Sequence, residues 1–182
     1  MLDSSEVQRG MEMVARAMAL SAQTAPKARG MDALRIRVVN RDRLSELATA
    51  MRRIGEERGL GFFLRDAGTV ENCDACLLVG VQREPTAGLD CGACGFVSCQ
   101  SMLSQPCMDQ TLMRGPACAV RVTDLGIAIG SAVKTASLHN VDNRVMYSIG
   151  AAALSLGWLG ECTAGFGIPL SAGAKNPFFD RG

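Results

Sequence analysis

Three cysteines within nine residues constrain this chain more than any other feature of its sequence. The segment "DCGACGFVSC" places Cys91, Cys94 and Cys99 at the spacing C-x2-C-x4-C. The first residues, "MLDSSEVQRG", show neither the basic nor the apolar region of a secretory signal, so we expect a cytoplasmic protein. Clustered cysteines in a reducing compartment are typical of metal ligands or redox groups rather than of disulfides.

The spacing of these cysteines favours an iron–sulfur cluster that needs one more thiolate. A 4Fe–4S cubane takes four thiolates, often three from one loop and the fourth from a remote segment. Cys107 and Cys118 are both candidates for the fourth ligand, since each closely follows a proline. Cys118 also opens a long apolar helix, whose positive dipole end favours a charged thiolate. The preferred ligand set leaves Cys107 open as the alternative and consists of Cys91, Cys94, Cys99 and Cys118.

A structural zinc site is the competing interpretation of the cysteines. The segment "CDAC" forms a second C-x2-C pair, and zinc sites often join two such pairs, here Cys73, Cys76, Cys91 and Cys94. That set leaves Cys99 and Cys118 unused, and it puts the "CDAC" pair at the edge of the apolar run "CLLVGV". Cysteine in such a run is usually a small core residue. We therefore expect Cys73, Cys76 and Cys162 to be buried thiols.

Length, charge and hydropathy limit the domain organisation and the kinds of partner that the chain can have. A chain of 182 residues fits a single domain, which we expect to span residues 1–182. Residues 83–118 hold three prolines and five of the eight cysteines, and therefore look like an inserted ferredoxin-like segment. The net charge of +1 argues against nucleic acid as a partner. The most apolar segments, 125–133 and 149–160, are too short to span a bilayer.

The order of predicted elements indicates an α+β fold with a mixed sheet flanked by helices. Asp3 and Glu6 are typical of a helix start, and Asp42 and Gly59 are expected to begin and end a second helix. Further helices are predicted near residues 119–138 and 144–157, and strands at 34–39, 61–65, 76–81 and 163–168.

Several longer motifs resemble a known family. The cysteine segment is followed by "GPACAVRVTDLGIAIGSAVKTA", "HNVDNRVMYSIGAAA" and "GIPLSAGAKNPFFDR". Together they resemble a family of uncharacterised prokaryotic proteins that contain a ferredoxin domain, over about residues 10–181. In that family a cysteine just before the "DLGIA" helix accompanies the three-cysteine motif, which implies that Cys118 is the fourth ligand.

The rest of the chain is similar to the nitroreductase superfamily. The stretch "ARAMALSAQTAPKARGMDALRIRVV" resembles the nitroreductase helix that ends at "AP" before the first strand, and "GIPLSA" is similar to a late strand. This resemblance implies a homodimer that binds FMN at its interface. Lys27, Arg29 and Arg181 are the cations expected to hold the FMN phosphate.

These patterns lead to one preferred function and two alternatives. The preferred function is a redox protein with one 4Fe–4S cluster that passes electrons to or from a flavin or a protein partner, which would make it an iron–sulfur oxidoreductase. The first alternative is an iron–sulfur electron carrier without flavin, and the second is a zinc-stabilised interaction protein. A nucleophile–base pair is not evident in the sequence, so hydrolysis has no support.

Overall fold

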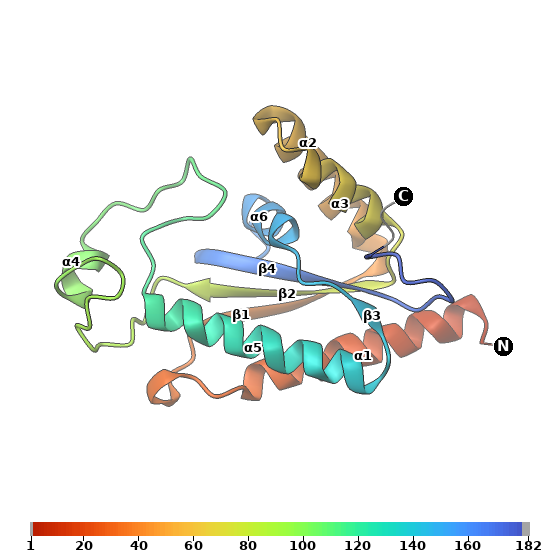
Figure 1. The fold of residues 1–182 in the computed structure, drawn as a ribbon, viewed down its shortest axis with the longest axis horizontal. Coiled ribbons are helices and arrows are strands. Elements are labelled where there is room, and N and C mark those ends of the chain that lie inside the picture. Colours follow the sequence, from red (N-terminus) through yellow and green to blue (C-terminus); the bar gives the residue numbers. More distant parts are fainter. Residues whose placement is uncertain (1, 180–182) are drawn as a thin grey trace.

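The computed structural model describes residues 2–179 and shows a four-stranded sheet with helices on both faces (Figure 1). The strands are β1 (Leu34–Asn40), β2 (Ala75–Gln82), β3 (Asp142–Asn143) and β4 (Cys162–Ser171). The helices are α1 (Ser4–Thr24), α2 (Leu44–Arg58), α3 (Gly61–Glu71), α4 (Cys99–Leu103), α5 (Ala119–Leu138) and α6 (Tyr147–Ser155). Two 3-10 turns, η1 (Ala28–Gly30) and η2 (Arg41–Arg43), flank β1. The predicted α+β class is therefore confirmed.

The sheet has the strand order β1-β2-β4-β3. Each of its three strand pairs is antiparallel, so the expectation of a mixed sheet is corrected for the described residues. A mixed sheet needs at least one parallel pair, and these four strands form none. Seven of the eight residues of β2 are buried, because this strand lies between two neighbours and under helices on both faces.

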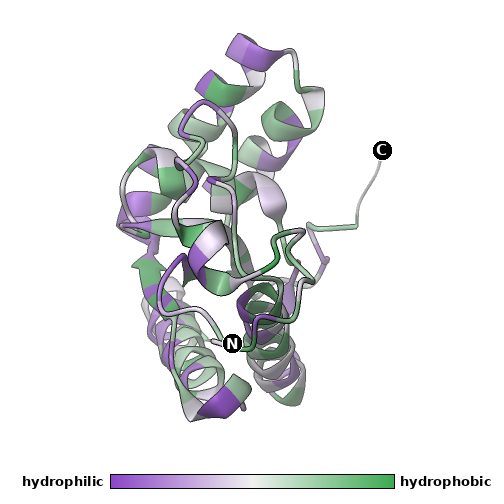
Figure 2. Cartoon of the chain, turned by 90° about the vertical axis from the view of Figure 1, so that its left-hand side faces the viewer, coloured by the Kyte–Doolittle hydropathy of each residue, from purple (hydrophilic) through white to green (hydrophobic). Residues whose placement is uncertain are grey.

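Alternate residues of β2 supply the two halves of the core. Leu77 and Val79 pack with α1 and α5 on one face, whereas Leu78 packs with α2, α3 and α6 on the other. This alternation follows from the two-residue period of a strand. Figure 2 looks onto one end of the molecule and shows α1 and α5 side by side. These two helices form one layer. In it, α5 begins near the side of the sheet from which the cysteine segment leaves (Figure 1).

Predicted helix ends are partly confirmed. The Asp3 carboxylate accepts hydrogen bonds from the amides of Ser5 and Glu6, and the Glu6 carboxylate accepts one from the Asp3 amide, which forms the expected capping box. Gly59 ends α2 in the left-handed conformation at φ 66°. The prediction that Asp42 caps α2 is wrong, because this residue lies inside η2 and the helix begins at Leu44.

The predicted strand at residues 61–65 is also wrong. Residues Gly61–Glu71 form α3, whose buried positions Phe63, Ala67 and Val70 are spaced by four and three residues. That spacing is helical, and it becomes visible only when the window extends beyond Arg65. Across residues 2–179, no helix combines the length and the hydropathy that a membrane span requires.

Candidate metal centre

Four cysteines line one small pocket where α5 begins. Cys91 and Cys94 lie in the loop before α4, Cys99 is the first residue of α4, and Cys118 is the N-cap of α5. Asp90, Phe96 and Met102 complete the walls, among other residues. Cys107 does not line this pocket; it borders a separate one with Arg83 and Arg114. The fold thus gathers the four cysteines of the preferred set and leaves Cys107 apart.

The loop that carries Cys91 and Cys94 is folded tightly. Gly92 and Gly95 have φ values of 72° and 87°, a region that side chains disfavour. The Gly95 amide donates a hydrogen bond of 2.9 Å to the Gly92 carbonyl, which closes a turn between the two cysteines. Glycine at these positions therefore allows Cys91 and Cys94 to lie in one short, tightly turned loop.

Cys99 is the cysteine whose thiol is most clearly prepared to ionise. The Asp90 backbone amide and the Thr86 hydroxyl donate hydrogen bonds to its sulfur and lower its pKa. The Cys99 amide in turn donates to the Asp90 carboxylate at 2.6 Å. Because the thiolate is the form that ligates metals, these contacts favour ligation by Cys99.

Cys118 supplies the inner wall of the pocket. It is buried, and it packs with Ala87 and Met102 in a small apolar cluster that Phe96 partly covers. An apolar wall limits the access of water to a bound cofactor, which is one of the means by which a protein sets a reduction potential. The position of Cys118 at the start of α5 also fixes it to the rigid part of the fold.

The other buried cysteines are held in the neutral thiol form by the core. Burial raises the pKa of Cys73 to about 12 and that of Cys162 to about 11, and it raises the pKa of Cys76 further above its usual value. All three thiols therefore stay protonated at neutral pH. The expectation that they are core residues is confirmed by their burial.

The zinc set of Cys73, Cys76, Cys91 and Cys94 is not assembled. Cys76 lies near the start of β2, and the cysteine loop leaves from its other end after Gln82. Six residues of strand span about 20 Å. Since Cys91 lies beyond that far end, the two C-x2-C pairs cannot share one ion, and the zinc interpretation of this set is wrong.

The four thiols of the cysteine pocket suit the donor chemistry of a cluster better than that of a single ion. Among residues 2–179, no three His, Cys, Asp or Glu side chains are close enough to hold one metal ion. A cubane makes a different demand, because each of its four irons binds one thiolate. Four thiols around one partly apolar pocket match that donor chemistry, and the ligand set remains a prediction.

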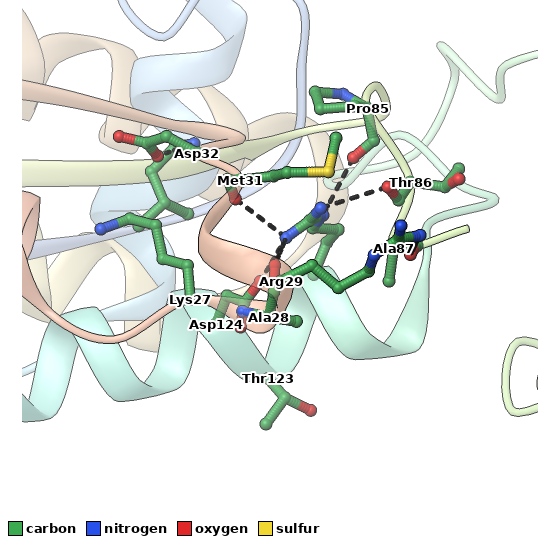
Figure 3. Close-up of polar contacts among 12 residues, drawn as sticks. Lys27, Ala28, Arg29, Met31, Asp32, Pro85, Thr86, Ala87, Thr123 and Asp124 are labelled. Carbon is green, nitrogen blue, oxygen red and sulfur yellow. Dashed lines mark hydrogen bonds and ion pairs between the residues drawn. The ribbon is translucent and has the colours of Figure 1, made fainter. Parts of the chain in front are cut away.

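A buried arginine holds the cysteine segment to the body of the protein. Arg121, in the first turn of α5, donates to Asp124 and to the carbonyls of two separate loops, whose residues are labelled in Figure 3. Its acceptors are the carbonyls of Ala28, Met31, Pro85 and Thr86, at 3.0–3.1 Å. Asp124 also accepts from the Ala28 amide at 2.9 Å. The pair thereby fixes the start of the cysteine segment beside Cys118.

Two further arginines fasten the same segment. Arg83 donates to three carbonyls at the end of α4, those of Met102, Leu103 and Gln105. Arg114 donates to the carbonyls of Leu154 and Gly160. None of these three arginines was predicted from the sequence. The available signal for Arg121 was an arginine and an aspartate three residues apart in an otherwise apolar helix.

The cations predicted to hold an FMN phosphate have other contacts. The Lys27 ammonium donates to the carbonyls of Ala22, Gln23 and Ala25 and so closes the end of α1. Arg29 donates to the Ala87 carbonyl at 3.3 Å, beside the cysteine segment. Arg181 lies outside the described residues. Of the two described cations, the fold brings Arg29 to the edge of the cysteine segment, whereas Lys27 binds the end of α1.

Comparison with known proteins places the sequence in a family. Residues 114–181 match a family described as "Uncharacterized protein containing a ferredoxin domain". That match includes Cys118 and begins after the other three cysteines of the pocket. An "Uncharacterized protein" of Archaeoglobus fulgidus is 41% identical over 172 residues, which cover 94% of this chain and 92% of the relative.

Solved structures identify the fold as nitroreductase-like. A putative nitroreductase from Desulfovibrio desulfuricans, solved in complex with FMN, has a TM-score of 0.57 at 14% identity and covers 94% of this chain and 79% of its own. NfrA1 from B. megaterium has a TM-score of 0.56 at 13% identity over 90% of this chain. This chain spans 59% of the length of NfrA1. By sequence, the chain belongs to the family of proteins described as containing a ferredoxin domain.

Proposed function

We propose that this protein is an iron–sulfur redox protein that holds one 4Fe–4S cluster. The observation that supports this proposal most strongly is one pocket where the cysteine segment meets α5. Its wall contains Cys91, Cys94, Cys99 and Cys118. A bound cluster would supply one-electron transfer. The family description, which names a ferredoxin domain, supports this proposal.

The residues of this chain have distinct roles in the proposal. The four thiolates hold the cluster, and the Asp90 amide and Thr86 hydroxyl stabilise the charged form of Cys99. Met102 and Phe96 exclude water from one side of the pocket. Arg121 holds the Pro85–Thr86 backbone in place, so that the loop and Cys118 keep their relative positions.

The colour and the metal content of the protein test this proposal directly. Full-length protein purified without oxygen is expected to be brown and to contain about four irons and four sulfides per chain. Iron and sulfide assays, together with the visible absorption spectrum, provide the measurement. A colourless protein that takes up zinc alone after reconstitution would contradict it.

A second candidate function adds a flavin as the partner of the cluster. The nitroreductase-like fold favours it, since the D. desulfuricans neighbour was solved in complex with FMN. Of the two predicted phosphate contacts that the structure describes, Arg29 is the exposed one, and it lies beside the cysteine segment. Electrons would then pass between the cluster and the flavin rather than directly to a protein partner.

Titration with FMN separates the two candidates. We expect FMN to bind the cluster-loaded protein and Arg29→Ala to weaken binding by about tenfold or more, since a charge-assisted hydrogen bond contributes roughly 1.5–3 kcal/mol. Flavin fluorescence reports the affinity, and Arg9→Ala on the exposed surface of α1 is the matched control. If wild-type protein with an intact cluster binds no FMN, the electron carrier without flavin is the correct function.

A further inference from the structure

The two edges of the sheet are unequal. At one edge, β3 has only two residues and offers little backbone for pairing. At the other edge, β1 has seven residues, pairs with β2 in an unbroken register, and contains neither a proline nor a bulge. Proteins usually protect long edge strands by such interruptions or by charge. Of these devices β1 has only charge, in Arg35 and Arg37, so its edge remains available to a strand of opposite charge.

The backbone groups that point outward from β1 can be assigned. Gln82 donates its amide to the Ala33 carbonyl, so residues 33, 35 and 37 are hydrogen-bonded to β2. The intervening residues, Ile36 and Val38, direct their amides and carbonyls away from β2. Within residues 2–179, no backbone or side-chain group hydrogen-bonds these outward groups.

The two faces of β1 differ in chemistry. Ile36 and Val38 face α1, where they line an open groove with Ala19 and Leu20. The polar side chains at its rim are Arg16, Gln23 and Asn40. The Leu20 side chain is 65% exposed in that groove. Arg35 and Arg37 lie on the opposite face, and Arg37 stacks on Trp158 at 4.7 Å from the ring centroid. In the described part of the chain, no carboxylate pairs with either guanidinium.

The arginines of β1 determine which kind of strand can pair with its free edge. A second copy of β1 in antiparallel pairing would bring arginines near arginines, and like charges across strands are destabilising. A strand with acidic residues on that face would instead pair with Arg35 and Arg37. Its apolar residues, on the other face, would cover Ile36, Val38 and Leu20. The same arginines thus discourage self-pairing and favour an acidic partner.

We propose that β1 is a docking edge for a partner protein, which adds an extended segment of alternating apolar and acidic residues as an antiparallel fifth strand. Strand addition of this kind draws affinity from main-chain hydrogen bonds and specificity from alternate side chains. The proposal goes beyond the redox function and does not depend on the cluster. In the added strand, the apolar residues lie opposite Ile36 and Val38, and their amides point toward β1.

Binding of dye-labelled octapeptides to the full-length protein tests the chemistry of the edge. A peptide of alternating Val and Glu is expected to bind, and one of alternating Val and Lys is not. N-methylation of the valines should abolish binding, because their amides face β1, whereas N-methylation of the glutamates should not. The Arg35→Glu, Arg37→Glu double variant should bind about tenfold more weakly, at roughly threefold per ion pair. Lys134→Glu, on an exposed position of α5, is the matched charge reversal and should bind like wild type.

Amide hydrogen exchange locates the bound peptide. We expect the Val–Glu peptide to slow exchange at Ile36 and Val38 and to leave Arg35 and Arg37 unchanged, since their amides already bond to β2. Equal binding of the Lys peptide, or protection elsewhere in the protein, would overturn the proposal. Protection of Ile36 and Val38 that grows with protein concentration before any peptide is added would assign the edge to a second copy and would also overturn it.

Discussion

Serine in place of Cys118 is expected to abolish or strongly destabilise the cluster, whereas serine in place of Cys107 leaves it intact. Cys118 lies in the wall of the four-cysteine pocket, and Cys107 borders a different pocket. A serine hydroxyl is a far poorer iron ligand than a thiolate, so one iron of the cubane would lose its protein ligand. Iron content and visible absorption after anaerobic purification measure the effect.

Cys107→Ser is a matched control for Cys118→Ser, because both variants replace a cysteine of the same segment. Serine at Cys91, Cys94 or Cys99 should behave like Cys118→Ser, since these residues line the same pocket. Serine at Cys162 should keep the cluster, although it places a hydroxyl in the core. Loss of the cluster in Cys107→Ser together with its retention in Cys118→Ser would show that the fourth ligand is wrongly assigned.

The sequence predicted the elements whose pattern is long and uniform. The buried run of β2 and the twenty residues of α5 were placed within one residue of their observed ends. The strand predicted at residues 61–65 failed because two phenylalanines in a five-residue window look alike in a strand and in a helix. Only Ala67 and Val70, further along α3, reveal the helical period.

In the candidate site, too, the local features were predictable from the sequence and the long-range contacts were not. The spacing of Cys91, Cys94 and Cys99 is local, so the sequence alone indicates that these three thiols lie close together. The choice between Cys107 and Cys118 depends on how the segment returns to the sheet, which Arg83 and α4 determine through long-range contacts. A hydrogen bond between an arginine and a distant carbonyl leaves no periodic signal. For this reason the arginines that anchor the segment were not predicted.

Loss of the Arg121 side chain is expected to destabilise the fold more than loss of any exposed ion pair. The guanidinium is 1% exposed and satisfies four carbonyls as well as the buried Asp124 carboxylate. Removing one partner of a buried pair costs about 3–5 kcal/mol, because the other charge stays buried without compensation. Folded domains are stable by only about 5–15 kcal/mol, so Arg121→Met removes a large share of that margin.

Urea denaturation of Arg121→Met measures this loss, with Arg52→Met as its control. Arg52 pairs with Glu71 on the surface, where both side chains are more than a third exposed, so its loss should change the stability little. With a urea slope of roughly 1–3 kcal/mol per molar, Arg121→Met should lower the unfolding midpoint by about 1 M or more. Adding Asp124→Leu to Arg121→Met removes the uncompensated carboxylate, and part of the lost stability should return. Equal midpoints for Arg121→Met and Arg52→Met would show that the buried pair does not anchor the segment, and that the cysteine pocket keeps its shape by other contacts.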